Sequence, residues 1–379
     1  MSKEDLLITP SKKVDIWKKI IEKKIAEGEQ IMIFLDTETT GGIMKGKGNA
    51  SSVLEKEDHL YMGLRHRVVE LGALVCYLDN ATGTIEQLKD HEDKPIYFHE
   101  YINFMSEKEE KLNKYLSIKE MPDGAWFVHG ISMEFLAGNE CLGEALEIYK
   151  NEKYKVPLPK SHKKTLRLPK PAPDFEQIVE PFMDVCGLNF DYNETPTNGR
   201  VTVIAHNFEF DAKFMNSEME NAGKPFLESL TLPMDSIVMA KGVFPKSYME
   251  EYKQSKIDQI RERFTGKKVN EETIKKEITK EIPKGLYSLD FLSFMLTDKG
   301  LMNMDGIDRT LHGAALDCEI LRRVYQGILS SEEYKLSPNK LAYNKTSIEG
   351  TITRLNDQAR PPHSNVVKID SQLLNRLKA

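Results

Sequence analysis

One stretch of the chain, Ile31-Met-Ile-Phe-Leu-Asp-Thr-Glu-Thr-Thr-Gly-Gly42, decides the fold. Its first five residues are an unbroken apolar run, which is typical of a strand buried on both faces. Asp36 and Glu38 follow at alternate positions, and alternate residues of a strand project to the same side of a sheet. The two glycines then favour a turn. The stretch therefore predicts a buried strand that presents two carboxylates on one face.

The Asp36 and Glu38 carboxylates suggest a metal site. Two carboxylates held this close repel each other, and both stay ionised cheaply only if a cation lies between them. Their hard oxygen atoms favour Mg²⁺ or Mn²⁺ over zinc. A solvated pair at the end of a strand is the alternative interpretation, because an Asp-x-Glu pattern is common in an acidic chain.

Composition limits the class of protein. The chain has 379 residues, of which 40% are hydrophobic and 30% charged, as expected for a soluble globular protein with one large domain plus appendages or with two domains. No apolar run approaches the roughly 20 residues needed to cross a bilayer, so we expect no membrane partner. The first residues lack a secretory signal, which predicts a cytoplasmic protein.

Charge and cysteines narrow the class further. With 53 Lys and Arg against 59 Asp and Glu, the net charge is −6. This charge argues against a protein that coats nucleic acid by bulk charge, but it is compatible with an enzyme that binds the end of one nucleic-acid strand locally. The four cysteines are scattered without a zinc spacing, which predicts reduced, buried thiols. They are Cys76, Cys141, Cys186 and Cys318.

Periodicity predicts further elements around the central strand. Val14, Trp17, Ile20 and Ile21 lie on one face of an amphipathic N-terminal helix. Further strands are expected at 68–78, 96–105 and 201–205, the second of these with alternating apolar and polar residues. Helices are expected at 132–137, 175–186, 286–296 and 314–329, with two more inside 246–284 joined near Gly266. The expected fold class is α/β, with a central mixed sheet flanked by helices.

Two later segments carry more candidate residues. Asp211 lies in the first turn of a helix that follows the buried strand at 201–205, where it could face a ligand crevice or only complement the helix dipole. His312 and Asp317 are five residues apart, so both can face one site only if His312 lies in the turn before the helix, as Gly313 permits. A surface or capping role is the alternative for His312.

The combined pattern resembles a known family. Phe34-Leu-Asp-Thr-Glu-Thr-Thr-Gly41, His206-Asn-Phe-Glu-Phe-Asp211 and Arg309-Thr-Leu-His-Gly-Ala-Ala-Leu-Asp317 resemble the three motifs of the DEDDh 3′→5′ exonucleases, and within them the epsilon proofreading subunits of bacterial DNA polymerase III. Connecting segments, including Arg67-Val-Val-Glu-Leu-Gly-Ala73 and Val128-His-Gly-Ile131, extend the likeness over roughly residues 30–328. The resemblance implies a ribonuclease H-like fold.

The resemblance also implies residue roles. Asp36, Glu38, Asp211 and Asp317 correspond to carboxylates that bind two divalent ions, Mg²⁺ or Mn²⁺, and His312 corresponds to the general base. The residues expected to contact the substrate are Asp36, Glu38, Thr39, His129 and Asp317. The implied reaction releases nucleoside 5′-monophosphates from single-stranded or mismatched DNA 3′ ends. At Gly124 the sequence lacks the acidic residue expected in the epsilon subunits.

We expect three parts in the chain: an N-terminal amphipathic helix over 1–29, an exonuclease domain over 30–329 and a C-terminal tail over 330–379. The last boundary rests on the fall in apolar density beyond residue 330 and on Pro338, Pro361 and Pro362. The domain has charged insertions near 43–65, 150–173 and 246–284. The stretch 150–173 is predicted to be a solvated excursion, and 246–284 a solvated helical hairpin rather than a path for DNA. The tail is expected to bind a DNA polymerase catalytic subunit, although it could dock on its own domain.

Two other functions are compatible with the same residues. An exonuclease that trims RNA 3′ ends, like oligoribonuclease or RNase T, shares the four carboxylates and the histidine. A catalytically idle adaptor in a replication assembly belongs to a different class. The five intact motif residues argue against the adaptor, because such a protein has no need of repelling carboxylates.

Overall fold

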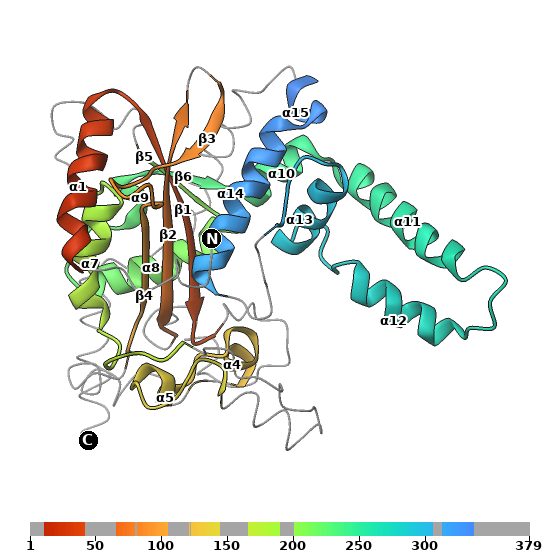
Figure 1. Cartoon of the computed structure of the whole chain (residues 1–379), viewed down its shortest axis with the longest axis horizontal. Coiled ribbons are helices and arrows are strands. Elements are labelled where there is room, and N and C mark those ends of the chain that lie inside the picture. The colour runs from red at the N-terminus through yellow and green to blue at the C-terminus, as the bar shows by residue number, and fades with distance from the viewer. Residues whose placement is uncertain are drawn as a thin grey trace, which may run out of the picture.

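The computed structural model describes residues 11–41, 66–79, 82–104, 121, 123–144, 166–189, 201–305 and 313–336. Within this part, six strands form one mixed sheet in the order β3-β2-β1-β5-β6, with β4 also paired to β2 (Figure 1). The strands are β1 (Gln30–Thr39), β2 (Val68–Asp79), β3 (Thr84–Gln87), β4 (Tyr97–Tyr101), β5 (Val201–Ala205) and β6 (Leu232–Asp235). β1 is antiparallel to β2 and parallel to β5.

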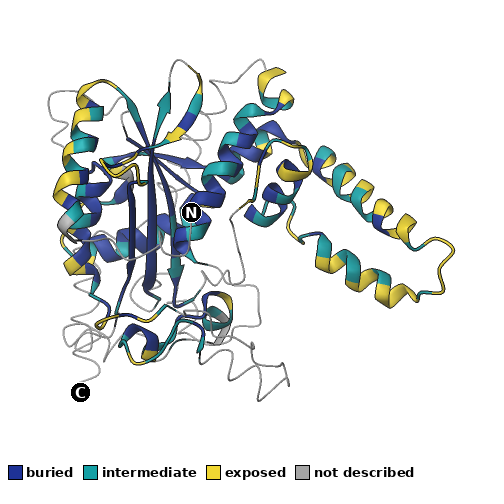
Figure 2. Ribbon diagram, in the orientation of Figure 1, coloured by how far each residue is buried: buried dark blue, intermediate teal, exposed yellow. Residues whose placement is uncertain are grey.

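The apolar run of β1 is buried on both faces, as predicted. Ile31, Ile33 and Leu35 enter one hydrophobic core, whereas Met32 and Phe34 enter a second core on the opposite face. All five are at most 4% exposed. Figure 2 shows the buried residues concentrated along the central strands.

The first core lies under three helices, α1 (Ser11–Ala26), α7 (Phe175–Val185) and α8 (Phe208–Asn221). Val14, Trp17 and Ile21 of α1 are buried in it, and Ile20 packs against it, so the N-terminal segment is the amphipathic helix that its spacing predicts. Lys13 and Trp17 also donate hydrogen bonds to the Asp90 carboxylate, which fixes α1 to the loop after β3.

The second core lies under α10 (Ser236–Val243), α13 (Leu289–Asp298) and α14 (Ala314–Ser330). α14 crosses β1 and β2, and α15 (Glu332–Leu336) follows it directly (Figure 1). Two short helices, α4 (Asp123–His129) and α5 (Met133–Leu136), lie below the sheet in this view, and α9 (Leu227–Leu230) precedes β6.

Two helices project away from the sheet as a hairpin, α11 (Lys246–Arg263) and α12 (Glu271–Glu281) (Figure 1). Ile260 is buried, and Ile257, Phe264 and Ile278 pack against the second core, as their spacing predicts. Gly266 lies between the helices with φ +78°, a conformation that glycine adopts without strain. Arg263 pairs with Glu281 at 2.5 Å, so part of the hairpin's charge is balanced internally.

The architecture confirms the predicted α/β class with a central mixed sheet flanked by helices. Among the described residues, no helix is both long enough and apolar enough to span a bilayer. The division into three parts stays a prediction. Residues 42–65, most of 150–173 and the tail beyond Leu336 lie outside the described residues.

Three local predictions were wrong. The strand expected at 96–105 is confined to Tyr97–Tyr101, and both its faces are buried because helices and loops cover each side of the sheet. The end of the supposed solvated excursion is packed, since Leu168 and Ala172 belong to a third core beneath α5. Cys141 is partly exposed, unlike the other three thiols.

Candidate metal centre

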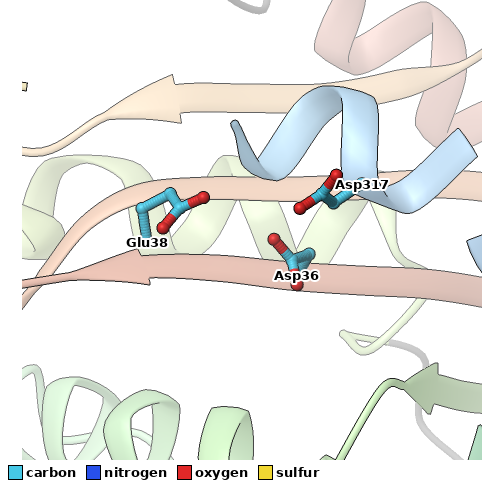
Figure 3. A group of neighbouring side chains, drawn as sticks. All are labelled: Asp36, Glu38 and Asp317. Carbon is cyan, nitrogen blue, oxygen red and sulfur yellow. The ribbon is translucent and has the colours of Figure 1, made fainter. Parts of the chain in front are cut away.

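Three carboxylates from distant parts of the chain meet on one face of the sheet (Figure 3). Asp36 and Glu38 project from β1 toward α14, and Asp317 comes from the first turn of α14. One ligand oxygen from each lies within 4.8 Å of the others. This three-residue group is called the carboxylate cluster below. Its geometry agrees with the strand alternation and helix placement expected from the sequence.

Glycine in β2 allows α14 to come this close. Gly72 is the register partner of Asp36. A Cβ added at Gly72 would lie 2.7 Å from the backbone carbon and oxygen of Ala314 and 2.7 Å from the Tyr97 hydroxyl. Real Cβ atoms essentially never make such short contacts. The first turn of α14 can therefore pack against the sheet only because residue 72 has no side chain. The positive end of the α14 dipole then faces the cluster, where it favours negative charge.

The cluster is electrostatically strained without a cation. Burial, followed by the charges of Asp317, Asp211, Glu38 and Glu70, raises the pKa of Asp36 well above its usual range. Protonation would relieve this repulsion, and so would a bound divalent cation. A donor set made only of carboxylate oxygens fits a hard ion such as Mg²⁺ or Mn²⁺.

Asp211 lies beside the cluster rather than in it. The side chain is 2% exposed, and its Oδ1 accepts hydrogen bonds from the Thr37 N–H at 3.1 Å and the Thr37 hydroxyl at 2.8 Å. Burial raises its pKa to about 7, although the bonds from Thr37 act in the opposite direction. Asp211 thus does more than complement the dipole of α8. Its hydrogen bonds with Thr37, which lies between Asp36 and Glu38, connect this helix to β1.

The predicted substrate residues Thr39 and His129 lie together at the end of β1. His129 is 2% exposed, its Nδ1 accepts the Ile131 N–H at 3.0 Å, and its Nε2 lies 3.2 Å from the Thr39 carbonyl oxygen. This pattern assigns the ring proton to Nε2, which donates to Thr39. His129 therefore fastens the segment after α4 to β1, and its contact with a nucleotide stays a prediction. His312 lies outside the described residues.

Sequence reasoning gave no role to Glu70 and His99, whose side chains form a buried pair close to the cluster. His99 Nε2 lies 2.8 Å from Glu70 Oε1. Glu70 is a charged residue inside a run that is otherwise apolar or glycine from Val68 to Leu78, which was the available signal. Its pairing with His99 could not be read from the sequence, because β4 was not placed beside β2.

Sequence comparison gives a relative that agrees with the motifs. No protein-family model matches the chain. The chain is 27% identical over 216 residues to a curated protein of Rickettsia prowazekii (strain Madrid E) named DNA polymerase III subunit epsilon, and the match covers 56% of each chain. The chain thus spans little more than half the length of this relative. The name is that of the subunit that the motifs resemble, so the resemblance drawn from them is confirmed.

Several solved structures are more distantly similar. A 3′-exonuclease recognising the histone mRNA stem-loop is 12% identical with a TM-score of 0.37, and the match covers 79% of this chain and 82% of that one. Pop2p of S. pombe, in a form with bound Mg²⁺ and Mn²⁺, is 12% identical with a TM-score of 0.38, covering 86% and 92%. At these scores the likenesses carry no conclusion about function.

Proposed function

We propose that the chain is a 3′→5′ exonuclease of the DEDDh type with a ribonuclease H-like fold. The observation that carries the proposal is the carboxylate cluster, in which Asp36, Glu38 and Asp317 converge from a strand end and a helix start. Holding three repelling carboxylates together, with Asp317 buried and the other two partly exposed, costs stability, so their convergence favours a site that holds cations. The named relative supports the same activity.

The chain's own residues supply the ligands and the proton acceptor. Asp36, Glu38, Asp317 and Asp211 would hold two divalent ions, which lower the pKa of an attacking water and neutralise charge on the phosphoryl and leaving oxygens. His312 would take the proton from that water, because an ordinary histidine pKa near 6.5 lets it act as a base near neutral pH. Such base assistance is typically worth about 10²- to 10⁴-fold in rate.

The proposed substrate is a single-stranded or frayed DNA 3′ end, and the proposed setting is proofreading beside a replicative polymerase. The relative's name favours DNA over RNA. Thr39 and His129 lie where β1 leaves the cluster, which supports a role for this corner in receiving the terminal nucleotide. The tail over 330–379 would bind the polymerase subunit.

A direct test uses 5′-labelled single-stranded DNA and RNA of one sequence with Mg²⁺, with Mn²⁺, or with chelator. We expect stepwise shortening of DNA from the 3′ end, faster than of RNA and abolished by chelation. Asp317→Asn is the matched inactive variant. Preferential RNA cleavage would favour the RNA-trimming alternative. No cleavage of either substrate, or equal activity in Asp317→Asn, would reject the proposal.

A further inference from the structure

Glu70 and His99 form a buried polar pair on the face of the sheet that carries the carboxylate cluster. Their side chains are 3% and 2% exposed, and the His99 Nε2 donates to Glu70 Oε1 over 2.8 Å. The His99 ring lies between Tyr97 and Tyr101, with centroids 5.9 and 5.0 Å away. The aromatic neighbours restrict the ring, and the ring holds the carboxylate.

The sheet register places this pair directly beside the cluster. Glu70 is the partner of Glu38, and His99 is the partner of Gly72, which is itself the partner of Asp36. α14 packs across β1 and β2, the strands that carry Asp36, Gly72 and Glu70. Glu70 is outside the group of three carboxylates whose oxygens lie within 4.8 Å of one another. The pair therefore lies next to the cluster without belonging to it.

Glu70 also lies close to the backbone that leads into α14. A Cβ added at Gly313 would lie 3.6 and 3.8 Å from the two Glu70 carboxylate oxygens, which is ordinary van der Waals contact. Gly313 is the last residue before α14 and has no side-chain cap. The Glu70 carboxylate, held by His99, thus lies beside the start of the helix that carries Asp317, with space for a methyl group between it and the Gly313 backbone.

Stability alone does not account for this pair. A buried ion pair is often no more stabilising than apolar residues of similar volume, and here a fourth carboxylate adds repulsion to three others. The hydrogen bond from His99, in contrast, fixes the Glu70 carboxylate at one position beside the start of α14. Groups that orient metal ligands in this way commonly affect metal affinity or activity by about 10- to 100-fold.

We propose that Glu70 and His99 are positioning residues that set the first turn of α14, and hence Asp317, at the spacing that the carboxylate cluster needs to bind divalent ions. The inference rests on the proposed function, because it deepens the account of the same site. It assigns Glu70 a role through its hydrogen bond and contact, not as a metal ligand.

The test compares Mn²⁺ binding to full-length variants by calorimetry, with thermal unfolding measured in parallel. We expect Glu70→Leu to raise the Mn²⁺ Kd by about 10- to 100-fold. Glu70→Gln keeps the size and the acceptor oxygen, so its Kd should stay within about threefold of the wild type. Because the pair acts as a unit, Glu70→Leu/His99→Phe should bind Mn²⁺ no more weakly than Glu70→Leu alone.

Ile178→Ala is the control for general destabilisation, since Ile178 is a residue of α7 that is buried in the first core. It should lower the Tm without changing the Mn²⁺ Kd. Equal losses of Mn²⁺ affinity in Glu70→Leu and Glu70→Gln would show that Glu70 acts through its charge or as a ligand. A normal Mn²⁺ Kd in Glu70→Leu would leave Glu70 only a structural role. Either result overturns the inference. Absence of nuclease activity in a wild type that binds Mn²⁺ would instead reject the proposed function.

Discussion

At the scale of single residues, the carboxylate cluster should oppose stability when no cation is present. Burial, followed by the like charges around it, raises the pKa of Asp36. We therefore expect Asp36→Asn to raise the Tm of the protein in chelator, because the neutral amide removes repulsion. The same change should lower nuclease activity about 10³-fold, since the ligands support several kcal/mol of transition-state stabilisation. Thermal unfolding with and without Mn²⁺ checks the first effect, and cleavage of single-stranded DNA checks the second. Stabilisation of Asp36→Asn by Mn²⁺ equal to that of wild type, or unchanged cleavage, would contradict them.

A second residue-scale prediction concerns Glu100 in β4, which is 9% exposed. Burial raises its pKa to about 7, against weaker opposing effects of His99 and Lys170. The folded state therefore binds this proton more tightly than the unfolded state, so stability is full below about pH 4 and is lost as the pH rises through 7. Glu100→Gln should match wild type at pH 4 and exceed its unfolding free energy at pH 8 by roughly 2–3 kcal/mol.

Urea unfolding of the two proteins at both pH values measures this difference. Asp90 gives a contrasting control. Burial would raise its pKa, but hydrogen bonds from Lys13, from two backbone N–H groups and from Trp17 lower it to about 2. Replacing Asp90 by Asn should therefore destabilise at pH 8, the opposite sign. A Glu100→Gln variant weaker than wild type at pH 8 would show that the carboxylate has a partner that stabilises its charge.

At the scale of elements, the contact between α14 and β2 decides whether the cluster forms. Gly72→Ala would place a Cβ 2.7 Å from the Ala314 backbone, which cannot yield as a flexible side chain can. We expect a loss of about 1–3 kcal/mol in unfolding free energy, as for other overpacked sites, together with weaker Mn²⁺ binding as α14 shifts. Gly313→Ala is the matched control at the same end of α14, because its backbone is extended and its Cβ would meet only ordinary contacts. Equal Mn²⁺ affinity in the two variants would rule out this role for Gly72.

Much of this element scale could be predicted from the sequence. The run from Ile31 to Leu35 identifies the central strand because burial on both faces needs unbroken apolar residues, and alternation then puts Asp36 and Glu38 on one side. The sequence could not place β3 and β6, since each has only four residues and its stability comes from pairing with a neighbour. The same reason hides the pairing of Glu70 with His99, which depends on the register of two strands.

Long-range polar pairs could not be predicted from the sequence either. Arg67 and Glu218 are 151 positions apart, yet they form a buried ion pair with N···O distances of 2.6 Å. Glu218 also accepts the Val68 N–H at 3.2 Å. The pair fastens the start of β2 to α8, the helix that carries Asp211, and nothing in either local sequence specifies its partner. Local patterns thus located the site's carboxylates, whereas the contacts that hold their elements together follow from the tertiary fold.

At the scale of the whole molecule, the tail and the domain should be separable functions. The truncation point must follow α15, because Glu333 accepts hydrogen bonds from Tyr248 at 2.7 Å and Lys299 at 2.6 Å and thereby joins α15 to α11 and the segment after α13. A chain ending at Leu336 should keep its Tm and its cleavage of single-stranded DNA within about twofold, since it retains the described contacts of the second core. It should lose binding to the polymerase catalytic subunit, measured by size-exclusion chromatography of the mixture.

A second truncation at Ser330 removes α15 as well, and we expect it to be less stable. If the chain ending at Leu336 still bound the polymerase, the partner surface would lie on the domain. If that chain bound the polymerase but no longer cleaved DNA, the tail would belong to the active site instead.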